Sequence, residues 1–147
     1  RQHNIGPWVN PTSSDTIFVI NCAKNEVVDM PVTPYYLLDN ASITCSNKIV
    51  SGTCSVREVT GGRNIEYVGL YAGRNIIVDN TYNFGEAGAV TTTTVGGQVS
   101  LTLNLSGLQV NSTVSSLPST GFIYARMGLK IEGIDAMVYT EPFKLSI

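Results

Sequence analysis

Apolar and polar residues alternate most regularly in the second half of the chain. In residues 98–105 every second position is Val or Leu, and polar residues fill the positions between them. Residues 121–132 alternate in the same way. The apolar face of that segment consists of Ile123, Ala125, Met127, Leu129 and Ile131. A period of two predicts strands with one buried face and one face in solvent.

Shorter β-prone runs, separated by turn-forming residues, occupy much of the remaining chain. The expected runs are residues 16–22, 26–33, 41–45, 53–60, 64–72, 74–79, 136–140 and 143–147. Pro31 and Pro34 make the second run an edge strand or an irregular one, because proline cannot donate to a sheet. Pro142 predicts a bend between the last two runs.

The spacing of these runs and the composition indicate the same fold class. The chain has 147 residues, of which 43% are hydrophobic and only 14% are charged. Lys, Glu and Arg decorate exposed helix faces, so their scarcity disfavours helices, whereas Val, Ile, Thr and Tyr suit a pleated surface. We expect an all-β, two-sheet antiparallel sandwich, immunoglobulin-like or jelly-roll, with roughly nine to eleven strands.

A tetrapeptide occurs twice around the expected run 64–72. It reads Gly-Arg-Asn-Ile at residues 62–65 and again at residues 73–76. Glycine and asparagine tolerate left-handed backbone angles, so the two copies are predicted to form two similar turns. Four residues are too few to make a structural repeat.

The first 15 residues differ from the rest and are predicted to form an N-terminal arm, followed by one domain over residues 16–147. Gly6-Pro7 and Asn10-Pro11 break regular structure. Between them stand Trp8 and Val9, and Trp8 is the only tryptophan of the chain. So large a side chain is costly to leave in water. We therefore expect Trp8 and Val9 to dock on their own domain or on a neighbouring copy.

Charge and hydropathy narrow the classes of partner. The net charge is −2, and no basic cluster exceeds two residues, so we expect no nucleic-acid partner. No apolar run approaches the length of about 18 residues that a membrane helix requires, so no membrane insertion is expected.

Three cysteines bear on the compartment. Cys45 and Cys54 flank a short segment with a turn signal near Gly52, and two strands joined there would bring the thiols within disulfide reach. A Cys45–Cys54 disulfide is therefore predicted, with Cys22 as the spare thiol or the true partner of one of them. Three reduced cysteines are the alternative. A disulfide would suit a secreted or cell-surface protein.

Three sequons permit N-glycosylation in such a setting. They begin at Asn40, Asn104 and Asn111. The alternation in residues 98–105 places Asn104 on the solvent face, where a glycan is tolerated.

Catalytic chemistry finds little support in the sequence. The only histidine is His3, on the arm, so Ser–His–Asp and Cys–His mechanisms lack a positioned base. A carboxylate pair for a glycosidase cannot be recognised from spacing alone. We therefore expect a protein without enzymatic activity and without a cofactor. If a metal ion binds, these oxygen-rich loops favour calcium, with Asp79, Asn80 and Glu86 as candidate ligands.

Aromatic residues offer a second kind of site. Tyr82 and Phe84 lie beside glycines in an expected loop, and exposed loop aromatics favour binding of a carbohydrate or a receptor. Residues 89–95 are β-prone and uncharged, and such a strand at a sheet edge can pair with another chain.

These observations lead to a main functional hypothesis and several alternatives. The main one is a structural subunit of an extracellular assembly (a filament, pilus or surface sheath), whose copies associate by strand addition or arm exchange. The alternative is a carbohydrate- or receptor-binding module of an adhesin or viral surface protein. A jelly-roll glycosidase is a third interpretation. A stability domain of a larger surface protein, with the arm as a linker, is a fourth, and the sequence does not separate it from the first two.

Overall fold

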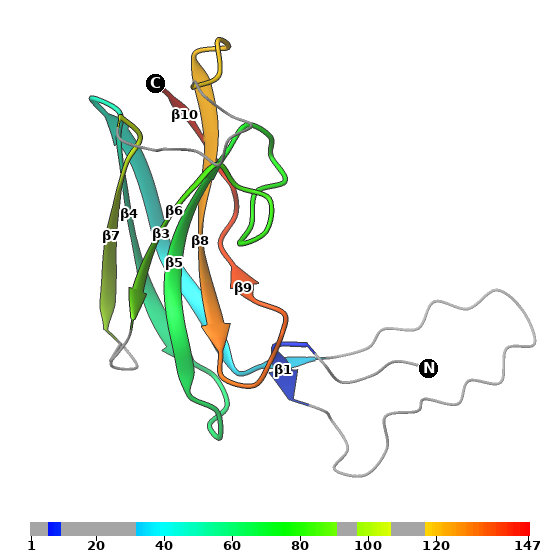
Figure 1. Cartoon of the computed structure of the whole chain (residues 1–147). Coiled ribbons are helices and arrows are strands. Elements are labelled where there is room, and N and C mark those ends of the chain that lie inside the picture. The colour runs from blue at the N-terminus through cyan, green and yellow to red at the C-terminus, as the bar shows by residue number, and fades with distance from the viewer. Residues whose placement is uncertain (1–5, 10–31, 91–96, 107–116) are drawn as a thin grey trace, which may run out of the picture.

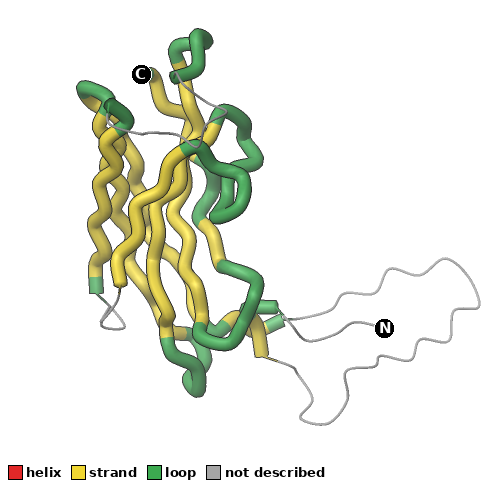
Figure 2. The backbone as a smooth tube through the Cα atoms, viewed as in Figure 1, coloured by secondary structure: helices red, strands yellow, loops and turns green. Residues whose placement is uncertain are grey.

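The computed structural model describes residues 6–9, 32–90, 97–106 and 117–147, with only the backbone of Ala89 and Val90. These residues form ten strands and no helix (Figures 1 and 2). The strands are β1 (Trp8–Val9), β2 (Thr33–Pro34), β3 (Tyr36–Ser46), β4 (Ile49–Glu58), β5 (Ile65–Gly73), β6 (Gly85–Val90), β7 (Gln98–Asn104), β8 (Phe122–Ile131), β9 (Val138–Tyr139) and β10 (Phe143–Ser146). The all-β prediction is confirmed.

Two antiparallel sheets make up the sandwich. One has the strand order β3-β4-β7, and the other has the order β10-β8-β5-β6, with β9 also paired to β8. Figure 1 shows the two sheets face to face, with the short β1–β2 ribbon at the lower end. The described part of the chain contains no helix with the length and hydrophobicity needed to cross a bilayer.

The core lies between the sheets and confirms the two clearest alternation patterns. The five apolar residues of the β8 face are all fully buried. Along β7, Val99, Leu101 and Leu103 are buried, while the residues between them are exposed. From β5, Val68 and Leu70 enter the same core. Packing of these side chains holds the two sheets together.

The hairpin of β3 and β4 corrects the predicted disulfide. Its two-residue turn is Asn47-Lys48, with φ of 50° and 62°, and Gly52 lies in the middle of β4. Cys45 therefore lies opposite Val50, and Cys54 lies four residues further along β4, about 13 Å away. Both thiols are free. A disulfide requires Cα atoms within about 7 Å, so the Cys45–Cys54 prediction is wrong.

Cys54 has become a core residue instead. Its side chain is 1% exposed, and burial raises the pKa of its thiol to about 11. Cys45 is half-buried, and burial raises its thiol pKa as well.

Two further local predictions fail around β5. Residues 74–79 do not form a strand, because they are part of the loop from β5 to β6. The Gly-Arg-Asn-Ile copies are not two similar turns. Gly62 has a left-handed φ of 101° ahead of β5, whereas Gly73 is the last residue of β5 and has no positive φ.

The described piece of the arm docks on its own chain. Trp8 pairs with Pro34 and Val9 pairs with Thr33, which forms the β1–β2 ribbon. The Tyr35 amide also donates a hydrogen bond to the Pro7 carbonyl (3.1 Å). The described part of the arm thus contacts its own chain, and docking on a neighbouring copy stays a prediction.

Several predictions lie outside the described residues. They concern His3, Cys22, Asn111, the strand at 16–22, most of the strand at 26–33 and most of the tract at 89–95. At the other end of the chain, β9 and β10 flank Pro142, as the predicted bend requires.

Candidate functional site

The loop from β5 to β6, residues 74–84, lies at the upper end of the sandwich (Figure 1). Residues of this loop line a pocket. The cavity has a volume of about 260 Å³. It is lined by Gly73, Arg74, Asn75, Ile77, Thr81, Tyr82, Asn83 and Phe84. The structure thus brings together both aromatic candidates from the sequence. Tyr82 is 69% exposed, while Phe84 is half-buried against the core.

A network around Asp79 shapes this loop. One carboxylate oxygen of Asp79 accepts hydrogen bonds from the amides of Thr81 (2.8 Å) and Tyr82 (2.6 Å). The side-chain amide of Asn83 donates to the carbonyls of Asp79 (3.0 Å) and Asn80 (3.2 Å). An aspartate that caps its own turn restricts the backbone, so these bonds hold Tyr82 in position.

Tyr139 of β9 anchors the loop from outside. Its hydroxyl accepts a hydrogen bond from the Asn80 amide (3.1 Å) and donates to Asn80 Oδ1 (2.8 Å). The Tyr139 ring lies over Gly128, where a Cβ would come within 2.6 Å of it, and the Arg126 guanidinium stacks 3.9 Å from the ring centroid. Burial is the main cause of a raised pKa at Tyr139. The sequence pointed to no role for Tyr139, since β9 is remote from the loop in the chain.

Two contacts pack the loop against the end of β5. A Cβ on Gly73 would lie 2.9 Å from Cγ2 of Val78, so Val78 packs directly on the Gly73 backbone. Val78 is fully buried, and the Phe84 amide donates to the Ala72 carbonyl (2.9 Å). The loop therefore folds back on the sheet, and Ile77 (71% exposed) and Tyr82 face solvent.

The proposed calcium ligands are not gathered into one group. The Asp79 carboxylate accepts the amide bonds described above, and Asn80 Oδ1 accepts from Tyr139. Glu86 lies on β6, opposite Tyr71. Within the described residues there is no cluster of three or more His, Cys, Asp or Glu that could hold a metal ion. Calcium binding stays a prediction.

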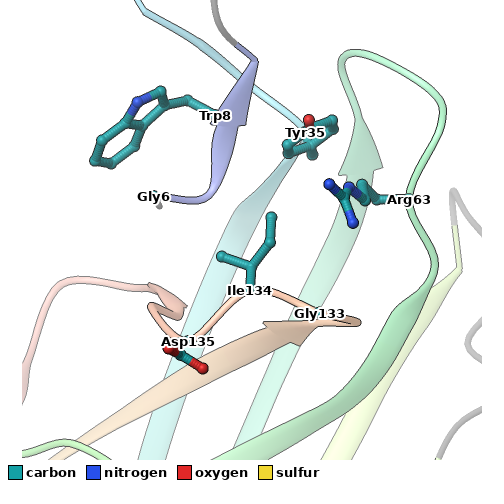
Figure 3. A pocket seen from close by; sticks show the side chains of 7 residues that line it. All are labelled: Gly6, Trp8, Tyr35, Arg63, Gly133, Ile134 and Asp135. Carbon is teal, nitrogen blue, oxygen red and sulfur yellow. The ribbon is translucent and has the colours of Figure 1, made fainter. Parts of the chain in front are cut away.

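A second cavity, of about 140 Å³, lies at the lower end of the sandwich (Figure 3). Its lining residues are Gly6, Trp8, Tyr35, Arg63, Gly133, Ile134 and Asp135. In Figure 3 the side chains of Tyr35, Arg63 and Ile134 gather on one side, with Trp8 and Asp135 on the other. The Arg63 guanidinium lies 6.0 Å from the centre of the Tyr35 ring. The sequence singled out Trp8 but not the other lining side chains.

Hydrogen bonds from neighbouring strands hold the wall that carries Arg63. The Tyr36 hydroxyl donates to the Arg63 carbonyl (2.5 Å). The side-chain amide of Asn64 donates to Glu132 Oε2 (3.1 Å), and the Asn64 carbonyl accepts from the Glu132 amide (2.9 Å). This wall is thereby tied to β3 on one side and to the segment after β8 on the other.

The adjoining wall is the turn that follows β8, where a Cβ on Gly133 would lie 3.4 Å from the Arg63 guanidinium. Gly133 adopts a left-handed φ of 72°, and the Ile134 amide donates to the Ile131 carbonyl (3.1 Å). The Lys130 ammonium donates to the carbonyls of Ile134 and Asp135. These bonds leave the Asp135 side chain exposed at the cavity.

Two of the three sequons lie in the described residues. Asn40 is exposed, with φ of 53°, at an irregularity in β3. Asn104 is exposed at the end of β7, as the alternation predicted, and its Oδ1 accepts a hydrogen bond from the Ser106 amide (2.8 Å). Glycosylation at either residue stays a prediction.

Comparison with known proteins identifies relatives of the whole fold. Residues 36–144 match the family model described as "Domain of unknown function (DUF3823_C)". A crystal structure of a DUF3823 family protein from Bacteroides ovatus is 26% identical and covers 97% of this chain, with a TM-score of 0.73. Another, from Parabacteroides merdae, is 22% identical and covers 96%, with a TM-score of 0.72. No curated protein matches the chain.

A third solved structure carries a description of function. It is described as a "putative carbohydrate binding protein" from Bacteroides uniformis, and it is 16% identical over 83% of this chain, with a TM-score of 0.62. This chain spans 70%, 65% and 61% of the lengths of the three solved proteins, in the order given. At such identities the last two show a common sandwich fold, and a common fold does not by itself establish a common function.

Proposed function

The chain belongs to the DUF3823_C family, and we propose that it is a carbohydrate-binding module whose site is the pocket of the β5–β6 loop. The observation that carries the proposal is that Tyr82, an aromatic residue that is 69% exposed, lines a cavity of about 260 Å³. Large aromatic side chains bury much area and dominate binding energetics, so a ring held open to solvent beside a pocket favours a ligand.

The chemistry of the lining suits a saccharide. A sugar ring has an apolar face of C–H groups, which can stack on an aromatic ring, and hydroxyl groups, which both donate and accept hydrogen bonds. Tyr82 offers the aromatic face, while Arg74, Asn75 and Thr81 bring guanidinium, amide and hydroxyl groups to the same cavity. Apolar surface with a few placed polar groups is the usual make-up of a small-molecule site.

The loop is also held in its shape before any ligand arrives. Asp79 fixes the amides of Thr81 and Tyr82, and Tyr139 fixes Asn80. A loop that is already ordered loses less conformational entropy on binding, which favours affinity.

The remaining observations support a binding module better than a filament subunit. The B. uniformis structure is described as a "putative carbohydrate binding protein", and none of the three solved relatives is described as a filament component. The described part of the arm pairs with β2 of its own chain. We propose that the module acts outside the cell or at its surface, without catalysis, and that its partner is a saccharide.

Binding to a panel of neutral and acidic polysaccharides by affinity electrophoresis, followed by calorimetry on soluble oligosaccharides, tests the proposal. Tyr82→Ala is expected to weaken binding about tenfold, and Tyr82→Phe to retain most of it, because the ring face carries the contact. Ile76→Ala is the matched control, since Ile76 is exposed on the same loop but does not line the pocket. Equal affinity of Tyr82→Ala and the unmodified chain would contradict this site.

A further inference from the structure

We propose that the lower cavity, between Trp8, Tyr35, Arg63 and Asp135, is a second saccharide site that takes a single neutral sugar unit. The inference rests on the proposed function in its choice of ligand class, but it uses none of the residues of the upper pocket. Arg63 stands before β5 and the upper loop follows it, so about 26 Å of strand separates the two sites.

The cavity presents a cation and an anion that do not satisfy each other. Among the described residues the Arg63 guanidinium has the Tyr35 ring as its partner, and it makes no ion pair with Asp135. No described group donates a hydrogen bond to the Asp135 carboxylate, whose neighbouring backbone is held by Lys130. Five N–H donors and two acceptor oxygens are thus available around one space.

This pair of charges selects the class of ligand. An acidic ligand would be attracted by Arg63 but repelled by Asp135, and a basic ligand would be attracted by Asp135 but repelled by Arg63. A neutral polyol avoids both repulsions, because each hydroxyl can accept from the guanidinium and donate to the carboxylate. The Tyr35 ring, the Trp8 ring and Ile134 supply the apolar surface against which the C–H groups of a sugar pack.

The cavity has the properties of a built site. Its volume of about 140 Å³ suits one sugar ring partly enclosed by protein, rather than an oligosaccharide. The wall with Arg63 is held by the Tyr36 hydroxyl, and the wall with Asp135 is held by the Lys130 ammonium. The described arm closes the third side through the pairing of Trp8 with Pro34.

Trp8 makes this site separately measurable. It is the only tryptophan of the chain, and it lines the lower cavity but not the upper pocket. Titration with the methyl glycosides of glucose, galactose and mannose should change the tryptophan fluorescence to a saturating limit. Galacturonic acid and glycine serve as the acidic and zwitterionic probes.

Four variants decide the outcome. Arg63→Ala and Asp135→Ala are each expected to raise the Kd about tenfold or more, because each loses a charged hydrogen-bond partner. Arg57→Ala is the control, since Arg57 is an exposed arginine that lines neither cavity and pairs with Asp39. Tyr82→Ala should leave the fluorescence titration unchanged.

The failures of the two proposals are distinguishable. A fluorescence response with no effect of Tyr82→Ala on any binding would overturn the upper site and support the lower one. No response to any methyl glycoside, a preference for galacturonic acid or glycine, or an unchanged Kd in Arg63→Ala would each overturn the lower site.

Discussion

The two Gly-Arg-Asn-Ile copies stand at the two ends of β5 and fold differently. In the first copy Gly62 is exposed with a left-handed φ, and Ile65 enters β5 and packs against the core. In the second copy Gly73 is buried at the end of β5, and Ile76 is 58% exposed. The first copy thus buries its isoleucine end and exposes its glycine end, and the second copy does the reverse. The difference teaches that the neighbours in space, rather than the tetrapeptide, decide its conformation.

Each end of β5 nevertheless uses a tyrosine hydroxyl from another strand as an anchor. At the lower end Tyr36 of β3 donates to the Arg63 carbonyl, and at the upper end Tyr139 of β9 binds Asn80. Tyr36 is 3% exposed, and its pKa is raised mainly by burial, with a smaller contribution from the charge of Glu58. Two cavities of different chemistry are therefore held by the same kind of contact.

The largest effect on stability is expected from adding a methyl group at Gly73, which is closely packed, and not at Gly88, which is not. Gly73→Ala should lower the free energy of unfolding by about 1 to 3 kcal/mol, because the new methyl group would lie 2.9 Å from Val78. Gly88→Ala is the control, since nothing lies within 4 Å of its Cβ position. Urea denaturation measures both. Equal stability of the two variants would show that the loop shifts freely and that Val78 does not fix it.

Removing one of the two tyrosine hydroxyls should weaken ligand binding only at the cavity that this hydroxyl supports. Tyr139→Phe is expected to lower the free energy of unfolding by about 1 kcal/mol, because Asn80 loses both of its bonds to the hydroxyl. It should weaken oligosaccharide binding at the upper pocket and leave the Trp8 titration unchanged. Tyr36→Phe should do the reverse, through the freed Arg63 carbonyl. If either variant affected both ends equally, the two sites would not be independent.

The smallest effect is expected from alkaline pH at the upper end. The pKa of Tyr139 is raised above its ordinary value of 10.0, so its contribution to stability is complete below pH 10 and is lost as the pH rises through the pKa of the folded state. A tyrosinate cannot donate to Asn80 Oδ1. Upper-site affinity should therefore decline above pH 10 in the unmodified chain, and less steeply in Tyr139→Phe. Parallel pH profiles of the two proteins would contradict this role of the hydroxyl.

The candidate site could be predicted only in part. Tyr82 and Phe84 were recognisable because aromatics beside glycines indicate an exposed loop, and the structure places both on one pocket. Arg63 and Asp135 were not recognisable, since 72 positions of sequence separate them and only the pairing of β5 with β8 brings their segments together. The disulfide prediction failed because a turn at Asn47-Lys48 changed the register of the hairpin.

The sequence by itself determined the class of fold and the faces of its strands. Alternation in residues 98–105 and 121–132 decides which side chains are buried, because consecutive side chains of a strand point to opposite faces. Only the tertiary structure decided the register of the β3–β4 hairpin that carries Cys45 and Cys54. It also decided the two different conformations of the tetrapeptide and the residues that line both cavities. These depend on long-range pairing, in which a buried contact such as Val78 on Gly73 outweighs the weak preferences of a four-residue segment.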